Sequence, residues 1–128
     1  LASHFTQAAD FVSSGPGATL VHCESGMSRS GAVAIAVVMI LEGATLQAAY
    51  DCVLRARPVL MPNLGFFTEL RGLEVKVRGH ESMTEFDWMM KKLMHPFMST
   101  EEARARQALE AVSARSRGYD AYHDAIEW

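Results

Sequence analysis

The stretch HCESGMSRSG, residues 22–31, lies between a short apolar run and a long apolar run. ATLVH, residues 18–22, predicts a buried strand, and GAVAIAVVMIL, residues 31–41, predicts a helix that is apolar on nearly all sides. Gly, Ser and Arg occupy the loop between them. Because the backbone N–H groups of a loop that opens a helix can converge on an anion, this order of residues predicts an anion-binding loop at a helix N-terminus.

Length, net charge and cysteine content limit the classes of protein to which this chain can belong. The length of 128 residues is typical of one domain, and a net charge of −3 provides no basic surface for nucleic acid. The apolar run at 31–41 is too short to span a bilayer. The two cysteines, Cys23 and Cys52, form no disulfide framework. We therefore expect a protein of a reducing compartment, the cytoplasm or the nucleus, that binds neither nucleic acid nor a membrane.

Helical spacing and capping residues predict helices on both sides of the loop. Residues 1–12 have apolar side chains at helical spacing, and the SSGPG turn at 13–17 ends that helix. Gly43 predicts the end of the helix that follows the loop. Thr45 and Asn63 predict the N-caps of two further helices.

The last third of the chain also predicts helices. Residues 75–82 read as a linker, and Ser82 with Glu85 predicts a capping box before a methionine-rich amphipathic helix. Ser99 with Glu102 predicts a second capping box. Only residues 18–22 clearly predict a strand, and buried strand backbone needs partners. We therefore expect a helix-rich fragment whose remaining sheet precedes Leu1.

Cys23 has the neighbours of a reactive thiolate. A free cysteine has a pKa of about 8.5, and the positive end of a helix and a nearby Arg29 both favour the thiolate. The planar guanidinium of Arg29 can bind two phosphate oxygens, and Ser30 can donate a hydrogen bond to the departing thiolate. Gly26 allows the loop to curve tightly. The expected phosphate-binding residues are Glu24, Ser25, Gly26, Met27, Ser28 and Arg29.

The stretch LVHCESGMSRSGA resembles the signature of the dual-specificity protein tyrosine phosphatases, in which Cys, five residues, Arg and Ser/Thr form the active-site loop. FTQAADFV before it, and AVVMILEGATLQAAYDCVLRARPVLMPNLGFFTEL after it, resemble the neighbouring helices and the Arg-Pro…Pro-Asn segment of that family. The resemblance covers residues 1–74. It implies an α/β fold with a central, mostly parallel sheet flanked by helices. It also implies hydrolysis of phosphotyrosine and phosphoserine or phosphothreonine through a phosphocysteine, without metal or other cofactor.

The resemblance also implies roles for single residues. Cys23 would be the nucleophile, Arg29 the phosphate ligand, and Ser30 the residue that helps to expel Cys23 in the second step. His22 would orient the cysteine backbone and help to lower the pKa of the thiol, and Asn63 would brace the loop. In this reading, residues 1–81 are the C-terminal part of the catalytic domain and residues 82–128 are a helical extension.

The general acid is the main departure from the family pattern. Family members place an aspartate on a loop ahead of the helix that resembles residues 1–12. Asp10 is the only aspartate before Cys23, and it lies within that helix, where we expect a solvated side chain. We therefore expect the acid upstream of Leu1. A general acid is worth about 10²–10⁴ in rate, so this chain would turn over slowly.

Other readings of the sequence stay open. A pseudophosphatase would use the same loop to bind phosphate without turnover. The low-molecular-weight tyrosine phosphatases take their acid from near the C-terminus, but neither Asp120 nor Asp124 is followed by the proline of that family. Residues 82–128 could instead be a helical module that docks a protein partner, or they could cover the surface of the catalytic domain itself. The aromatic residues of that module would be Trp88, Phe97, Tyr119, Tyr122 and Trp128.

The remaining candidate residues favour structural roles. Cys52 lies off the apolar stripe of its helix and reads as an inert surface thiol rather than a redox partner of Cys23. Arg57 is expected to pack and form salt bridges rather than bind substrate. A terminal cluster is expected to be solvated rather than to bind metal: Asp120, His123, Asp124 and Glu127. Since the loop has no lysine, a phosphoprotein is favoured over a polyanionic inositol lipid as the substrate.

Overall fold

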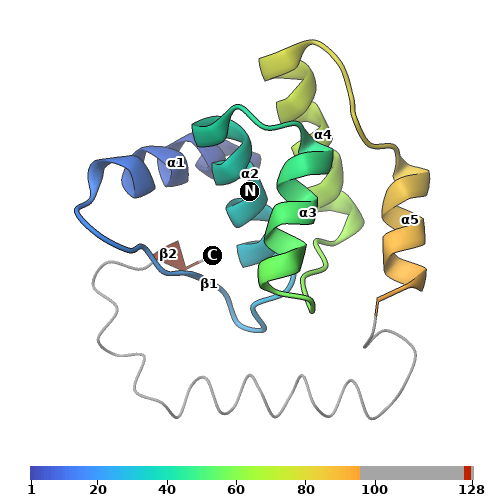
Figure 1. Cartoon of the computed structure of the whole chain (residues 1–128), viewed down its shortest axis with the longest axis horizontal. Coiled ribbons are helices and arrows are strands. Elements are labelled where there is room, and N and C mark those ends of the chain that lie inside the picture. Colours follow the sequence, from blue (N-terminus) through green and yellow to red (C-terminus); the bar gives the residue numbers. More distant parts are fainter. Residues whose placement is uncertain (96–125, 128) are drawn as a thin grey trace.

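The computed structural model describes residues 1–95 in full and the backbone of residues 126 and 127. Helices dominate the described residues, and Figure 1 shows their arrangement. The elements, in chain order, are the 3-10 helix η1 (Ala2–His4), α1 (Phe5–Ser14), β1 (Val21–His22), α2 (Arg29–Glu42), α3 (Leu46–Ala56), α4 (Leu64–Arg78), α5 (Glu85–Leu93) and β2 (Ile126–Glu127). Among the described helices, none has both the length and the apolar character needed to cross a membrane.

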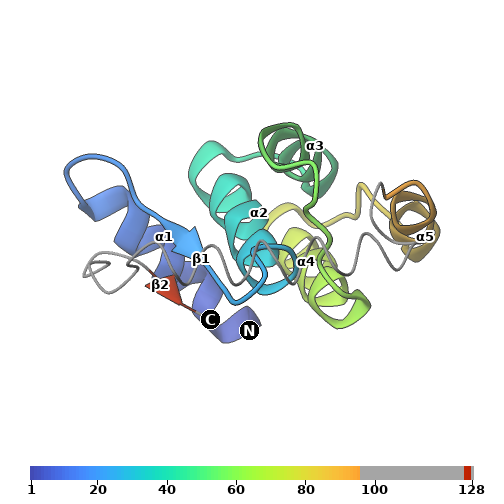
Figure 2. The same cartoon turned by 90° about the horizontal axis from the view of Figure 1, so that it is seen from below.

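Helix α2 lies at the centre of the molecule, between α1 and α3 (Figure 2). Its small and branched side chains, among them Val33, Ile35 and Ala36, are fully buried, which confirms the prediction of a helix that is apolar on nearly all sides. The surrounding helices contribute large core residues. Tyr50 of α3 and Phe67 of α4 meet edge to face, with ring centroids 6.3 Å apart.

The predicted helix boundaries around the core are confirmed. Gly43 ends α2 in the left-handed conformation, with φ +64°. Thr45 accepts a hydrogen bond from the backbone N–H of Ala48 at the start of α3. Asn63 accepts one from the N–H of Phe66 at the start of α4. Each of these boundaries depends on residues within four positions of it, so the sequence alone could predict them.

The predicted linker at residues 75–82 is wrong in its first half. Helix α4 continues through residues 75–78 and ends at Gly79, which has φ +81°. No glycine or proline interrupts residues 75–78, so the helical hydrogen bonds continue until Gly79 allows the left-handed turn.

The predicted capping box of Ser82 and Glu85 is also wrong. The cap of α5 is Thr84, which forms a capping box with Asp87. Ser82 is engaged elsewhere, because its N–H donates to Glu74 Oε2 at 2.8 Å and its hydroxyl accepts from the N–H of Gln47 at 3.0 Å. A side chain used in this tertiary contact cannot cap the next helix.

The predicted strand is shorter than expected. Only Val21 and His22 of residues 18–22 form β1, and they pair in parallel with Ile126 and Glu127 of β2. A strand is maintained only where a partner faces it, and β2 has two residues. The mostly parallel sheet implied by the resemblance is thus represented, within the described residues, by this one parallel pair.

Two expectations lie beyond what the described residues can test. The division into 1–81 and 82–128 stays a prediction. The capping box of Ser99 and Glu102 and the side chains of the terminal acidic cluster lie outside the described residues.

Candidate active site

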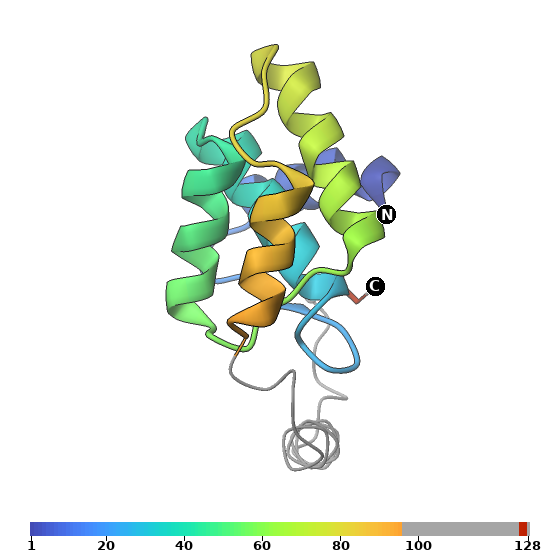
Figure 3. The same cartoon turned by 90° about the vertical axis from the view of Figure 1, so that its right-hand side faces the viewer.

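Residues 23–28 form a loop that follows β1 directly and opens α2 (Figure 3). Gly26 has φ +67°, a left-handed conformation that a residue with a side chain rarely adopts. Helix α2 begins at Arg29, immediately after the loop. The loop therefore lies at a helix N-terminus, as the sequence predicts.

Cys23 is half-buried, and its sulfur lies 3.2 Å from the hydroxyl oxygen of Ser30. Burial by itself raises the pKa of the Cys23 thiol. Hydrogen bonds from the Ser30 hydroxyl, and from the backbone N–H groups of Ser30, Gly26 and Met27, outweigh that effect and lower the pKa. The thiolate is therefore stabilised by short-range donors of the loop and of the first turn of α2.

Arg29 and Glu24 are neighbours at the solvent side of the loop. Nη2 of Arg29 lies 3.7 Å from Oε2 of Glu24, and the two side chains are 42% and 61% exposed. An ion pair this exposed is weak, so a bound anion could replace the carboxylate on Arg29. Arg29 thus lies beside the loop with a guanidinium group open to solvent.

Residues 57–63, here called the bracing segment, hold the loop from outside. Nε of Arg57 donates to the carbonyl oxygen of Gly26 at 2.6 Å, and the N–H of Met61 donates to the carbonyl oxygen of Met27 at 3.1 Å. The sequence predicts packing and salt bridges for Arg57, whereas the structure shows this hydrogen bond to the loop. Arg57 and Gly26 are 31 positions apart, so no local pattern could have revealed the contact.

Asn63 contacts the loop through its backbone. Its backbone N–H donates to the hydroxyl oxygen of Ser28 at 3.0 Å, while its side chain caps α4. One residue therefore fixes both the end of the loop and the start of a helix.

Gly31 sets the close approach of the bracing segment to α2. A Cβ atom at this position would collide with the side chain of Leu60, which is buried in the core. The missing side chain therefore lets the bracing segment lie directly against the first turn of α2. This role of Gly31 was not predicted from the sequence.

Two other sequence candidates, Asp10 and Cys52, lie apart from these contacts. Asp10 is exposed on α1, and Cys52 is an exposed free cysteine of α3. His22 ends β1 next to Cys23. Among residues 1–95, no three His, Cys, Asp or Glu side chains form a group that could hold a metal ion.

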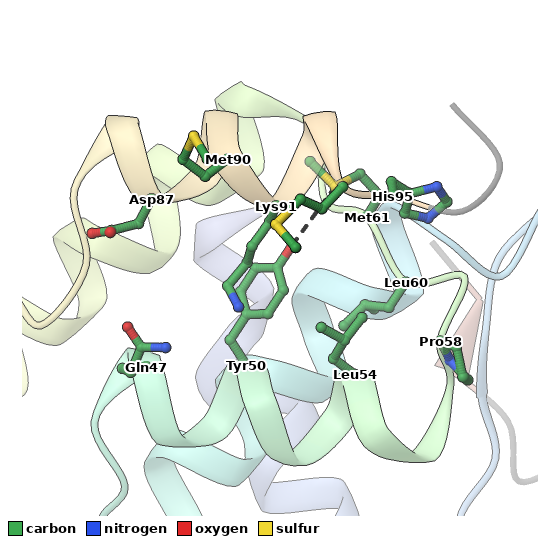
Figure 4. Close-up of a pocket in the computed structure, with 11 residues that line it drawn as sticks. Gln47, Tyr50, Leu54, Pro58, Leu60, Met61, Asp87, Met90, Lys91 and His95 are labelled. Carbon is green, nitrogen blue, oxygen red and sulfur yellow. Dashed lines mark hydrogen bonds between the residues drawn. The ribbon is translucent and has the colours of Figure 1, made fainter. Parts of the chain in front are cut away.

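A cavity of about 510 Å³ lies behind the bracing segment, between α3 and α5 (Figure 4). Tyr50 projects into it, with its hydroxyl group 3.8 Å from Sδ of Met61 and its ring 4.7 Å from Nζ of Lys91. His95 closes one end and makes a 2.9 Å hydrogen bond with the carbonyl oxygen of Val59. The cavity is mostly apolar and does not include the cysteine loop.

Comparison with known families identifies relatives of this chain. Residues 1–76 match the family described as "Dual specificity phosphatase, catalytic domain". Dual specificity protein phosphatase 14 of Mus musculus is 44% identical over 72 residues, which are 56% of this chain and 36% of the relative. Dual specificity protein phosphatase 5 of Homo sapiens is 35% identical over 80 residues, 60% of this chain and 21% of the relative.

The crystal structure of a variant of human DUSP28 is similar in fold. It superimposes with a TM-score of 0.60 at 35% identity, over 62% of this chain and 56% of that chain. The chain therefore matches about half of that solved structure and about a third or less of the length of these two curated relatives.

Proposed function

Because this chain belongs to the dual-specificity phosphatase family, we propose that it hydrolyses phosphate monoesters of phosphotyrosine and of phosphoserine or phosphothreonine in proteins. Cys23 is the nucleophile, and the N–H groups of residues 24–28 bind the phosphate together with Arg29. The observation that carries the proposal is the position of Cys23, whose pKa is lowered by the hydroxyl of Ser30 and by backbone N–H groups of the loop. A thiolate is the reactive form of cysteine.

In the first step, the sulfur of Cys23 attacks phosphorus, and an S–P bond forms as the ester P–O bond breaks. The leaving oxygen takes up a proton and departs as the alcohol or phenol of the substrate. The planar guanidinium of Arg29 and the loop N–H groups bind the phosphoryl oxygens, where negative charge is concentrated during transfer. No metal is needed for this step, because the loop itself supplies the donors.

In the second step, water attacks the phosphorus of the phosphocysteine and loses a proton, and the S–P bond breaks. The products are inorganic phosphate and the Cys23 thiolate. The Ser30 hydroxyl, 3.2 Å from the sulfur, is placed to donate a hydrogen bond to that thiolate as it leaves. This contact makes the sulfur a better leaving group.

Charge at the loop favours a phosphoprotein over an inositol lipid. The stretch from His22 to Gly31 contains no lysine, and it contains the carboxylate of Glu24 beside Arg29. A headgroup that carries several phosphates would need additional positive charge and would be repelled by Glu24. A single phosphate on a peptide needs only the loop and Arg29.

Hydrolysis of an activated aryl phosphate by the full chain tests this proposal. Cys23→Ser should reduce hydrolysis to background while the loop still binds inorganic phosphate, and the matched Cys52→Ser should leave hydrolysis unchanged, since Cys52 is an exposed thiol of α3. Mass spectrometry of the acid-quenched reaction should find a phosphoryl group on Cys23. Hydrolysis above background by a folded Cys23→Ser variant would exclude a cysteinyl mechanism. Phosphate binding without any turnover by the unchanged chain would favour the pseudophosphatase reading.

A further inference from the structure

Two consecutive peptide units of the loop are held by their carbonyl oxygens. The Gly26 carbonyl accepts from Nε of Arg57 at 2.6 Å, and the Met27 carbonyl accepts from the N–H of Met61 at 3.1 Å. No peptide bond among the described residues is cis. In a trans peptide the C=O and the following N–H point in opposite directions. The N–H groups of Met27 and Ser28 are therefore directed away from the bracing segment.

The Met27 N–H is directed at Cys23. It is one of the backbone groups that hydrogen-bond the sulfur. One peptide unit thus has Arg57 at its carbonyl end and Cys23 at its N–H end. Any rotation of this peptide would weaken both hydrogen bonds together, because the unit is planar.

We propose that Arg57 is a positioning residue of the phosphate loop, whose side chain fixes the Gly26–Met27 peptide so that the Met27 N–H faces the Cys23 sulfur. The contribution of this geometry to catalysis rests on the proposed function, whereas the geometry itself does not. Arg57 acts through the loop backbone and does not have to touch the substrate.

The contact between Arg57 and Gly26 is specific for these two residue types. A Cβ atom added to Gly26 would lie 2.9 Å from Nη2 of Arg57, so the guanidinium plane rests against the glycine backbone. A lysine has a flexible ammonium group instead of a rigid planar fork and could not hold the peptide in the same way. The left-handed conformation of Gly26 further limits the residues that this position accepts.

Charge is the competing explanation for any effect of Arg57 on Cys23. Among the described residues, the charged or titratable side chains on or against the loop include those of His22, Glu24, Arg29 and Arg57 itself. Removing a positive charge would disfavour the thiolate even without a change in geometry. Through-space effects of exposed charges are screened by salt, whereas the orientation of a peptide is not.

The test compares Arg57→Met and Arg57→Lys with Arg55→Met in the full chain. Arg55 is an exposed arginine of α3, two residues away. Arg55→Met therefore removes one positive charge, as Arg57→Met does, without removing the contact with Gly26. The pKa of Cys23 is measured from the pH dependence of its alkylation by iodoacetamide, at low and at high salt. We expect Arg57→Met to raise that pKa by about one unit at both salt concentrations, as for weakening one hydrogen bond to a charged acceptor. Arg57→Lys should recover less than half of the shift, and Arg55→Met should change nothing.

Three results would overturn the proposal. A shift that disappears at high salt would mean that Arg57 acts through its charge. An unchanged Cys23 pKa with weakened phosphate binding would make Arg57 a direct ligand. An unchanged pKa with a lower Tm would make its role structural. Where Arg57→Met does not fold, as judged by circular dichroism, Gly26→Ala displaces the guanidinium from the other side and should raise the same pKa.

Failure of the proposed function would be visible separately. Alkylation reports on Cys23 whether or not the chain hydrolyses phosphate esters. A shifted pKa in a chain without hydrolytic activity would overturn the proposed function and support the positioning role. If the chain hydrolyses phosphate esters but the Cys23 pKa does not shift in Arg57→Met, the proposed function is supported and the positioning role is overturned.

Discussion

Glu24 and Arg29, at the two ends of the loop, carry opposite charges. Glu24 is a carboxylate in a loop whose N–H groups and Arg29 suit an anion, and it contacts Arg29 at 3.7 Å. Before a phosphate can bind Arg29 bidentately, this contact must be given up. Because both side chains are exposed, the loss is small, and we expect Glu24 to lower the affinity of the loop for phosphate without preventing binding.

Replacing Glu24 with Gln should therefore tighten phosphate binding. We expect the Kd for inorganic phosphate to fall about two- to fivefold, the range of an exposed ion pair. Isothermal titration calorimetry of the full chain would measure it, with Glu42→Gln, at the end of α2, as the control. A weaker affinity in Glu24→Gln would mean that Glu24 orients Arg29 for the ligand.

The two cysteines should differ in their reactivity with pH. Since the pKa of Cys23 is lowered, a larger fraction of it is thiolate at any pH below the ordinary cysteine value. At about pH 6 a cysteine of ordinary pKa is less than about 1% thiolate. Brief iodoacetate treatment at this pH should label Cys23 and leave Cys52 largely unmodified, as read by mass spectrometry. Equal or preferential labelling of Cys52 would contradict the lowered pKa.

A buried carboxylate connects helices through hydrogen bonds, in addition to the apolar packing between them. Glu74 of α4 is fully buried, and its carboxylate accepts hydrogen bonds from the N–H of Leu46 at 2.9 Å and the N–H of Ser82 at 2.8 Å. It therefore connects the start of α3 with the segment after α4. Burial opposes its ionisation, but hydrogen bonds from the Ser82 side chain and from these two N–H groups hold its pKa below the usual range.

Glu74→Gln should destabilise the chain in a pH-dependent way. A lowered pKa in the folded state means that ionised Glu74 stabilises the fold above the unfolded-state value of about 4.3, and this stabilisation is lost as the pH falls through the folded-state pKa. Near neutral pH we expect a loss of about 1–3 kcal/mol, because an amide cannot accept both hydrogen bonds equally well. Urea unfolding at neutral and acidic pH should show the difference from the unchanged chain shrinking in acid. A difference that stays constant with pH would contradict this.

Helix α5 connects the second part of the chain to the bracing segment. The indole N–H of Trp88 donates to the carbonyl oxygen of Pro62 at 2.8 Å, and Lys91 pairs with Asp51 of α3 at 3.0 Å. Met83, just before α5, is buried in the core. The outer face of α5 still exposes large apolar side chains, including Phe86 and Leu93, 65% and 72% exposed.

Truncation separates the two readings of residues 82–128 for the molecule as a whole. Ending the chain after Glu81 removes the buried Met83 and the contact of Trp88 with the bracing segment, so we expect Tm to fall by more than about 5 °C. Ending it after His95 keeps α5 and should preserve most of the stability. Equal stability and solubility of the two truncated chains would instead favour an independent docking module.

The availability of an acid should determine which substrates the whole chain cleaves. Of the described aspartates, Asp51 accepts from Gln47 and Lys91, and Asp87 caps α5, so neither is held at the loop. A poor leaving group needs protonation, and a general acid contributes about 10²–10⁴ in rate. We expect activated aryl phosphates to be cleaved measurably and phosphothreonine peptides, which the proposed activity includes, only very slowly, with rates that fall steeply as the leaving-group pKa rises.

A flat dependence on leaving-group pKa would show that an acid acts within the chain. Stopped-flow rates for a series of substituted phenyl phosphates would measure this dependence. Asp10→Asn and Glu24→Gln would then identify the carboxyl group involved, since the acid variant alone should restore a steep dependence.

Local features of this protein were predictable from the sequence. The end of α2 at Gly43, the caps Thr45 and Asn63, and the loop that opens α2 at Arg29 all depend on residues within a few positions of one another. Capping and left-handed glycine conformations are determined by the backbone next to them. The Cys-x5-Arg-Ser stretch is equally local, so the position of the loop between β1 and α2 was predictable, while the catalytic roles of its residues stay predictions.

Tertiary structure alone decided what supports the site. The contacts of Arg57 with Gly26, of Glu74 with Leu46, and of Trp88 with Pro62 join residues 26 to 31 positions apart. Ser82 could cap a helix in isolation, but in the fold it bonds to Glu74 and Gln47, and Thr84 takes its place. From the sequence alone, each of these side chains could form hydrogen bonds with several different residues. Which one it takes depends on how the apolar faces of the helices pack, because that packing places the polar groups within hydrogen-bonding distance.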